Sequence, residues 1–280
     1  MNINLFKKKI DDLCKKYDLL TLDEFKNLSK LKTKKKKFLL SFDDSLIDHF
    51  KILDILKEKK LWGIFFIPTK PYLEKKFIPT FALHYLISYS GLRNVAIKVF
   101  EIIGQSNFDK RDFDYEEFGK IKKKSKTRYL KKIINSLIFF KNDNAKDIFI
   151  KKLIKEVKPD LKISDIHMSI KNIKELSKNG MLIGSHGITH NYMSDLNSKQ
   201  QFNEIKKSFE FFKKIDIRFY PKTFAYPYGK FHTFNIQTIN VLKKNNVKYG
   251  FIYNEKREVK NFKNSKDLII NRINPDEKNY

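Results

Sequence analysis

Apolar residues follow two alternating patterns along much of the chain. Short apolar runs that end in polar or turn residues predict buried strands. Six such runs are FLLSF (38–42), LWGIFFIP (61–68), MLIGS (181–185), TFAYP (223–227), KYGFIY (248–253) and DLIINRI (267–273). Apolar positions three or four residues apart predict amphipathic helices at about 46–56, 170–176, 198–214 and 233–245. Strands that alternate with helices at this spacing favour a parallel sheet or barrel.

Two segments depart from this alternation. Residues 4–30 show the pattern of one or two short helices, and residues 70–165 are highly charged with mainly helical periodicity. We therefore expect four parts: an N-terminal helical segment at 1–36, a first part of the parallel sheet or barrel at 37–69, a helical insertion at 70–165 and a second part of the sheet or barrel at 166–280.

Composition narrows the class of protein. The chain has 280 residues, of which 41% are hydrophobic, which excludes a wholly disordered protein. The single cysteine, Cys14, cannot form an internal disulfide. No apolar run reaches the roughly 18 residues of a membrane span, and the charged N-terminus lacks the apolar stretch of a secretory signal. We expect a soluble, cytoplasmic protein.

The net charge of +27 raises the question of a polyanionic partner. Lysine accounts for nearly all of this positive charge. Proteins that recognise nucleic acids bind base edges and phosphate groups mainly through the two-pronged guanidinium of arginine. The lysines are spread along the whole chain, which favours codon bias over a binding patch. We expect no specific nucleic-acid partner, although a Lys-rich nucleic-acid-binding protein stays as a lesser alternative. Such a surface would tolerate peripheral contact with an anionic membrane.

Three predicted strands end in residues that carry chemistry. Asp43 and Asp44 follow the first strand, His186 and His190 follow the third, and a Tyr228-Gly229 turn follows the fourth. Loops at the carboxyl ends of parallel strands are where α/β folds assemble their sites. Two imidazoles and one carboxylate can bind a divalent metal and leave positions open. The alternatives are an Asp that caps the next helix and histidines that are ordinary polar loop residues.

The segments FLLSFDDS, MLIGSHGITH and TFAYPYG resemble the first three motifs of the polysaccharide deacetylases, the NodB-homology or carbohydrate esterase family 4 enzymes. The resemblance covers roughly residues 36–68 and 165–275. It implies a distorted (β/α) barrel of the NodB-homology type with a largely helical insertion. It also implies an enzyme that uses a divalent metal, usually zinc, to remove acetyl groups from N-acetylated sugars.

The same resemblance implies a role for each matched residue. Asp43 would be the general base, and the metal ligands would be Asp44, His186 and His190. The backbone N–H of Tyr228 would stabilise the oxyanion. The ligand set suits Zn²⁺ and is also compatible with Co²⁺, Fe²⁺ or Ni²⁺.

The sequence departs from the family at several positions. Ser41 replaces the usual Thr, Ser45 stands in place of a Gly, and Ala225 in place of an Arg that orients the base. The last strand has no His to serve as the catalytic acid. Arg272 lies near that place and could hold the base or a substrate anion, but it cannot act as an acid. His232 and His84 are the candidate acids, although both are also compatible with ordinary surface or packing roles.

These features lead to a hypothesis and a runner-up. The hypothesis is a metal-dependent N-deacetylase acting on a polysaccharide, a glycolipid or a precursor of a surface glycan, and an intracellular lipid-linked saccharide fits the expected location. The runner-up is a catalytically impaired saccharide-binding protein of the same fold, which the missing acid and Ser45 suggest.

Overall fold

The computed structural model describes residues 3–105, 142–253 and 265–274, together with Asp114, Leu137 and Phe140. The chain divides into two compact units, one formed by Met1–Thr69 with His167–Tyr280 and the other by Lys70–Ile166. Apart from Leu137, the helical pattern near 130–138 lies outside the described residues.

The first unit is built on a six-stranded parallel sheet whose strands follow one another in chain order. The strands are β3 (Leu40–Phe42), β4 (Gly63–Ile67), β5 (Leu182–Ser185), β6 (Thr223–Ala225), β7 (Tyr249–Ile252) and β8 (Ile270–Asn271). All six predicted strands are present. Because strands β4, β5 and β7 are buried along their whole length, they appear in the sequence as continuous apolar runs. The fold matches the predicted (β/α) barrel.

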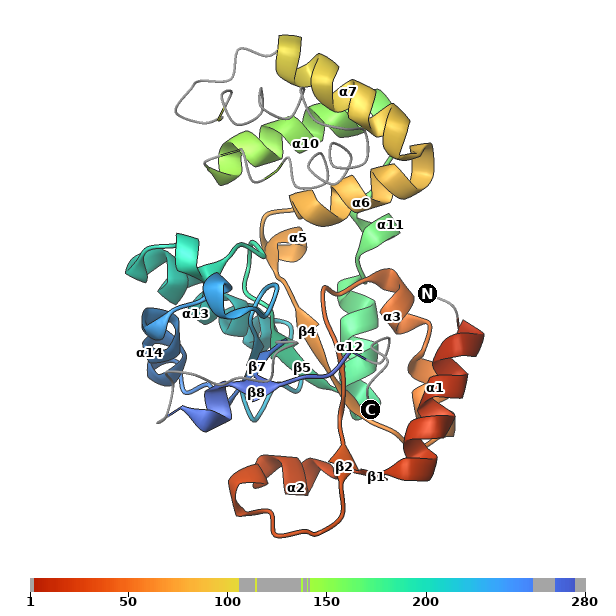
Figure 1. The fold of residues 1–280 in the computed structure, drawn as a ribbon, viewed down its shortest axis with the longest axis vertical. Helices are drawn as coiled ribbons and strands as arrows, with labels where there is room; N and C mark the ends of the chain where they lie inside the picture. Colours follow the sequence, from red (N-terminus) through yellow and green to blue (C-terminus); the bar gives the residue numbers. More distant parts are fainter. Residues whose placement is uncertain are drawn as a thin grey trace. The chain divides into compact units, whose positions relative to one another are not determined.

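Helices connect these strands and cover the sheet. They are α3 (Ile47–Phe50), α4 (Leu53–Glu58), α12 (Ile170–Lys178), α13 (Ser198–Lys214) and α14 (Ile236–Lys244). Helices α12, α13 and α14 begin with a capping box, in which two polar side chains satisfy backbone N–H groups at the first turn. Helices α13 and α14 pack beside each other (Figure 1). The helix predicted at 46–56 is two helices, because the chain turns at residues 51–52.

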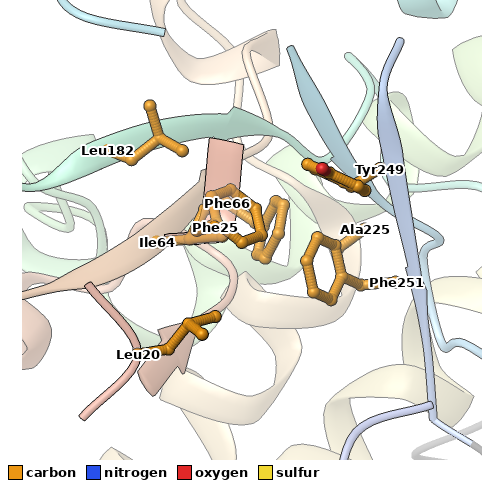
Figure 2. Packing of buried hydrophobic residues seen from close by; sticks show 8 residues of the cluster. All are labelled: Leu20, Phe25, Ile64, Phe66, Leu182, Ala225, Tyr249 and Phe251. Carbon is orange, nitrogen blue, oxygen red and sulfur yellow. The ribbon is translucent and has the colours of Figure 1, made fainter. Parts of the chain in front are cut away.

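The N-terminal segment belongs to the same compact unit as the sheet. It contains α1 (Ile3–Lys16), β1 (Asp18–Leu19), α2 (Leu22–Lys26) and a 3₁₀ turn at Leu28–Lys30. Leu20 and Phe25 are buried against Ile64 and Phe66 of β4 and Phe251 of β7 (Figure 2). The segment therefore supplies part of the core that packs on the sheet.

A short second sheet divides the first predicted strand. Strand β2 (Lys37–Phe38) pairs in parallel with β1, whereas β3 pairs with β4. The run 38–42 therefore changes partner at Leu39, which the apolar pattern alone does not reveal.

The described part of the second unit is helical. Its helices are α5 (Lys70–Leu73), α6 (Pro79–Ser90), α7 (Leu92–Gln105), α10 (Asp143–Val157) and α11 (Ile163–Ile166), and α6, α7 and α10 pack on one another (Figure 1). The side chain of Lys70 is 2% exposed, and its Nζ lies 2.6 Å from the Asp147 carboxylate. Within the described residues, no helix combines the length and apolar character that crossing a membrane requires.

Gly184 in β5 provides a test of sheet packing. A Cβ atom there would lie 2.5 Å from the Phe66 ring and from the Thr223 hydroxyl. We expect Gly184→Ala to lower the free energy of unfolding by roughly 1–3 kcal/mol through overpacking, measured by chemical denaturation. Gly104→Ala is the control, since a Cβ there meets nothing within 4 Å. Equal stability of the two variants would contradict this packing.

Candidate metal centre

The polar residues singled out in the sequence come together at the carboxyl edge of the sheet. Asp43 and Asp44 follow β3, His186 and His190 follow β5, Tyr228 follows β6, and Arg272 follows β8. Parallel strands place these ends at one edge, so residues far apart in the chain meet.

Asp44, His186 and His190 form a cluster with the composition of a metal site. Their ligand atoms all lie within 4.8 Å of one another. Asp44 Oδ1 is 3.3 Å from His186 Nε2 and 3.2 Å from His190 Nε2. The two imidazoles are 2% and 6% exposed, so water competes little for their nitrogen atoms.

Hydrogen bonding fixes which nitrogen of His186 faces the cluster. His186 Nδ1 lies 2.8 Å from the backbone oxygen of Ala225. A carbonyl oxygen only accepts, so Nδ1 carries a proton, and the ring in its neutral form directs the Nε2 lone pair toward Asp44. Asp44 Oδ1 is buried and makes no hydrogen bond within the described part of the chain. Lone pairs that converge in this way fit a divalent cation with two nitrogen ligands and one oxygen ligand.

The pKa values in the cluster reflect burial and opposite charge. Burial raises the pKa of Asp44, but the interactions with His186 and His190 lower it by more than burial raises it. The pKa of Asp44 therefore lies well below its usual range. Burial lowers the pKa of His190 despite the neighbouring Asp44. Burial acts the same way on His186, but Asp43 and Asp44 together raise its pKa above the ordinary value. An ionised carboxylate and a neutral His190 are the forms that bind a metal.

A buried glutamate that the motif analysis missed holds the loop between the two histidines. Glu204 of α13 accepts hydrogen bonds from the backbone N–H groups of Ile188 (2.6 Å) and Thr189 (3.0 Å) and from the Thr189 hydroxyl. Gly187 has φ 75°, and a Cβ there would lie 2.9 Å from Glu204 Oε2. Glycine at this position lets the carboxylate approach the loop. In the sequence, Glu204 looks like any other polar residue of an amphipathic helix, so the sequence did not indicate this role.

Asp43 is paired with Arg272. The guanidinium donates from Nη1 to Oδ1 at 2.6 Å and from Nη2 to Oδ2 at 2.7 Å. Burial raises the pKa of Asp43, but the positive charges of Arg272 and His186 lower it below the ordinary value. Arg272, just after β8, thus orients the carboxylate, whereas Ala225 contributes its backbone oxygen to His186.

Aromatic rings lead away from the cluster. Ring centroids are 4.8 Å apart for His190 and Tyr228, 4.6 Å for Tyr228 and Tyr192, and 5.7 Å for Tyr192 and His232. Tyr228 is 40% exposed and has φ 62°. His232 is exposed. Among the described ring contacts, His232 is connected to His190 only through Tyr192 and Tyr228. His84 is exposed on α6 of the other unit.

His167, which the motifs did not indicate, supports the turn that carries Asp44. Its Nδ1 lies 3.1 Å from the Asp44 backbone oxygen and 3.0 Å from Ser45 Oγ. Burial lowers the pKa of His167 to about 4, so the ring is neutral at neutral pH. The capping alternative for the aspartates is wrong, since Leu46 is the N-cap of α3 and no side chain caps that helix.

Comparison with known proteins relates part of the chain to a known family. The family described as "Polysaccharide deacetylase" matches residues 150–250, which include both histidines and Tyr228. This match contains the second and third motifs, confirms the resemblance to this family there, and agrees with the prediction of a deacetylase-type hydrolase. No curated protein matches the chain.

Two solved structures have a similar fold. The Streptococcus pyogenes deacetylase PplD in complex with acetate has a TM-score of 0.53 and 17% identity, covering 96% of this chain and 79% of that one. IcaB from Ammonifex degensii has a TM-score of 0.52 and 13% identity, covering 96% and 82%. At such low identity, these likenesses support the barrel fold.

The cluster predicts metal binding. We expect the purified protein to bind one equivalent of a divalent transition metal, and His190→Ala to lose most of this affinity because one of three ligands is removed. Elemental analysis and calorimetric titration of metal-free protein measure both quantities. His232→Ala is the control and should bind like the wild type. Full metal binding by the folded His190→Ala protein would contradict the site.

Proposed function

We propose that the protein is a metal-dependent deacetylase that hydrolyses the N-acetyl group of an acetylated saccharide. One observation carries the proposal: an oriented carboxylate stands beside a three-residue ligand set. Asp43 Oδ2 lies 4.0 Å from His186 Nε2, while both Asp43 oxygens are held by Arg272. A base and a Lewis-acid site in contact are what hydrolysis of an unreactive amide needs.

The roles divide among the residues of this edge. A bound divalent metal would polarise the acetyl carbonyl and lower the pKa of water toward about 7. The Asp43 carboxylate accepts a proton from the attacking water, since its lowered pKa keeps it ionised. The backbone N–H of Tyr228 is our candidate donor to the developing oxyanion, a role worth on the order of a hundredfold or more in rate.

The leaving amine must receive a proton. The last strand has no histidine, and Arg272 cannot give up a proton at ordinary pH. The contacts of His232 with the cluster pass through Tyr192 and Tyr228. We therefore assign the return of the proton to Asp43, which holds the proton taken from water. Protons then balance without a second acid.

The rings beside the cluster favour a saccharide. Tyr228 is 40% exposed, and its ring contacts both His190 and Tyr192. Aromatic rings combine a large apolar surface with a polar tip, which suits a sugar face. Among metals, the ligand set of two imidazoles and one carboxylate favours Zn²⁺, with Co²⁺, Fe²⁺ and Ni²⁺ also compatible.

Acetate release tests the proposal. On a panel of N-acetylated saccharides, we expect metal-dependent release by the wild type and a loss of roughly 10²–10⁴-fold in kcat for Asp43→Asn, which lacks the base. Asp54→Asn, at an exposed position of α4, is the matched control. Acetate release that survives Asp43→Asn in folded protein would refute the mechanism. Glycan binding without acetate release by the wild type would instead favour the non-catalytic saccharide-binding protein.

The Asp43–Arg272 pair predicts a change in pH dependence. Arg272→Gln removes a positive charge that lowers the pKa of Asp43, so that pKa rises. Because the base acts when ionised, the acidic limb of the kcat/KM profile should move to higher pH, and kcat should fall as the carboxylate loses its fixed orientation. Arg218→Gln, at an exposed position, should leave the profile unchanged. An unmoved acidic limb in Arg272→Gln would contradict this pairing.

A further inference from the structure

The backbone around Asp44 adopts a conformation that non-glycine residues rarely adopt. Asp44 and Ser45 have φ values of 74° and 51°, so two consecutive residues with side chains lie in the left-handed region. Such residues are disfavoured unless the surroundings determine their conformation. Glycine would adopt these angles without steric cost. Some other part of the molecule must therefore hold this turn.

Contacts from the segment before α12 supply that support. His167 Nδ1 lies 3.1 Å from the Asp44 carbonyl oxygen and 3.0 Å from Ser45 Oγ. The backbone N–H of Met168 donates to the Ser45 carbonyl at 2.8 Å, and Leu46 forms an antiparallel bridge with His167. His167 is 1% exposed and Ser45 is also 1% exposed, so water does not compete for these bonds.

The direction of the histidine bond is determined by its partner. The Asp44 carbonyl oxygen accepts only, so His167 Nδ1 must carry the hydrogen atom. The imidazole thus donates to the backbone of the residue whose carboxylate lies against His186 and His190. Rotation of the Asp44 peptide would break this bond and move Oδ1 away from the two ligand nitrogens.

We propose that His167 is a positioning residue for the metal site: it fixes the left-handed Asp44–Ser45 turn and so places the Asp44 carboxylate for the metal. This inference rests on the proposed function only through the metal site, and it does not require turnover. His167 thereby stabilises the positive φ at position 45, which a glycine there would adopt without support. Outer contacts of this kind typically affect metal affinity by 10–100-fold.

Two amide variants separate the hydrogen bond from the bulk of the ring. In His167→Asn the side-chain amide N–H falls near the place of Nδ1, whereas in His167→Gln it falls near that of Nε2. For calorimetric titration of metal-free protein with Zn²⁺, we expect His167→Asn to bind close to wild-type affinity. His167→Gln and His167→Ala should bind roughly 10–100-fold more weakly. The visible spectrum of the Co²⁺-loaded protein should change in the same two variants.

A rescue variant tests the turn itself. Adding Ser45→Gly to His167→Gln should recover part of the lost Zn²⁺ affinity, because glycine adopts the positive φ without support. His84→Ala, at an exposed position, is the control. The melting temperature of each metal-free variant shows whether it folds. If His167→Gln does not fold, the Zn²⁺ affinities of His167→Asn and of the double variant still compare a turn that keeps the N–H donor with a turn that lacks it.

Several outcomes would overturn the inference. Wild-type Zn²⁺ affinity in folded His167→Gln would do so, as would a loss of affinity in His167→Asn equal to that in His167→Gln. A lowered melting temperature with unchanged affinity would show a role in stability alone. Failure of the wild type to bind metal would refute the metal site and this inference together. Metal binding without acetate release would refute the proposed function and leave the inference intact.

Discussion

The site depends on one electrostatic constraint: two adjacent carboxylates must both stay ionised while largely shielded from water. Asp43 and Asp44 each have only 26% of the side chain exposed, and each raises the cost of ionising the other. The structure gives them different partners. Arg272 holds Asp43 in a two-pronged ion pair, and two imidazoles face Asp44. Both carboxylates approach His186, so the Arg272-held Asp43 and the Asp44–His186–His190 cluster share one centre.

Backbone conformation makes this sharing possible. Successive side chains of a strand point to opposite faces, which would separate the two carboxylates. The left-handed Asp44 interrupts that alternation at the end of β3. Backbone atoms also take part in the support, since Ala225 offers its carbonyl oxygen to His186 and Asp44 offers its own to His167. Departures from family residues at Ser45 and Ala225 are therefore compatible with an intact geometry.

Much of the fold could be predicted because its four central strands, β4 to β7, are buried along their whole length and appear as continuous apolar runs. Strand β4 is buried at every residue, and its predicted run contains it completely. The pairing of β1 with β2 could not be predicted, because two-residue strands leave no periodic pattern. The turn between α3 and α4 escaped prediction for a similar reason, since the apolar spacing continues through it.

The sequence by itself pointed to the three candidate ligands. Asp44, His186 and His190 stand in the loops that follow predicted strands, and the parallel topology brings such loops together. Only the tertiary structure decided which contacts support that cluster. The sequence left open whether Arg272 holds Asp43 or a substrate anion, and the structure pairs it with Asp43, 229 residues away. His167, which the motifs did not indicate, lies 123 residues from Asp44. Glu204 lies on α13, outside all three motifs. No local pattern encodes such contacts, because each arises only when the folded sheet brings distant backbone and side-chain groups within hydrogen-bonding distance.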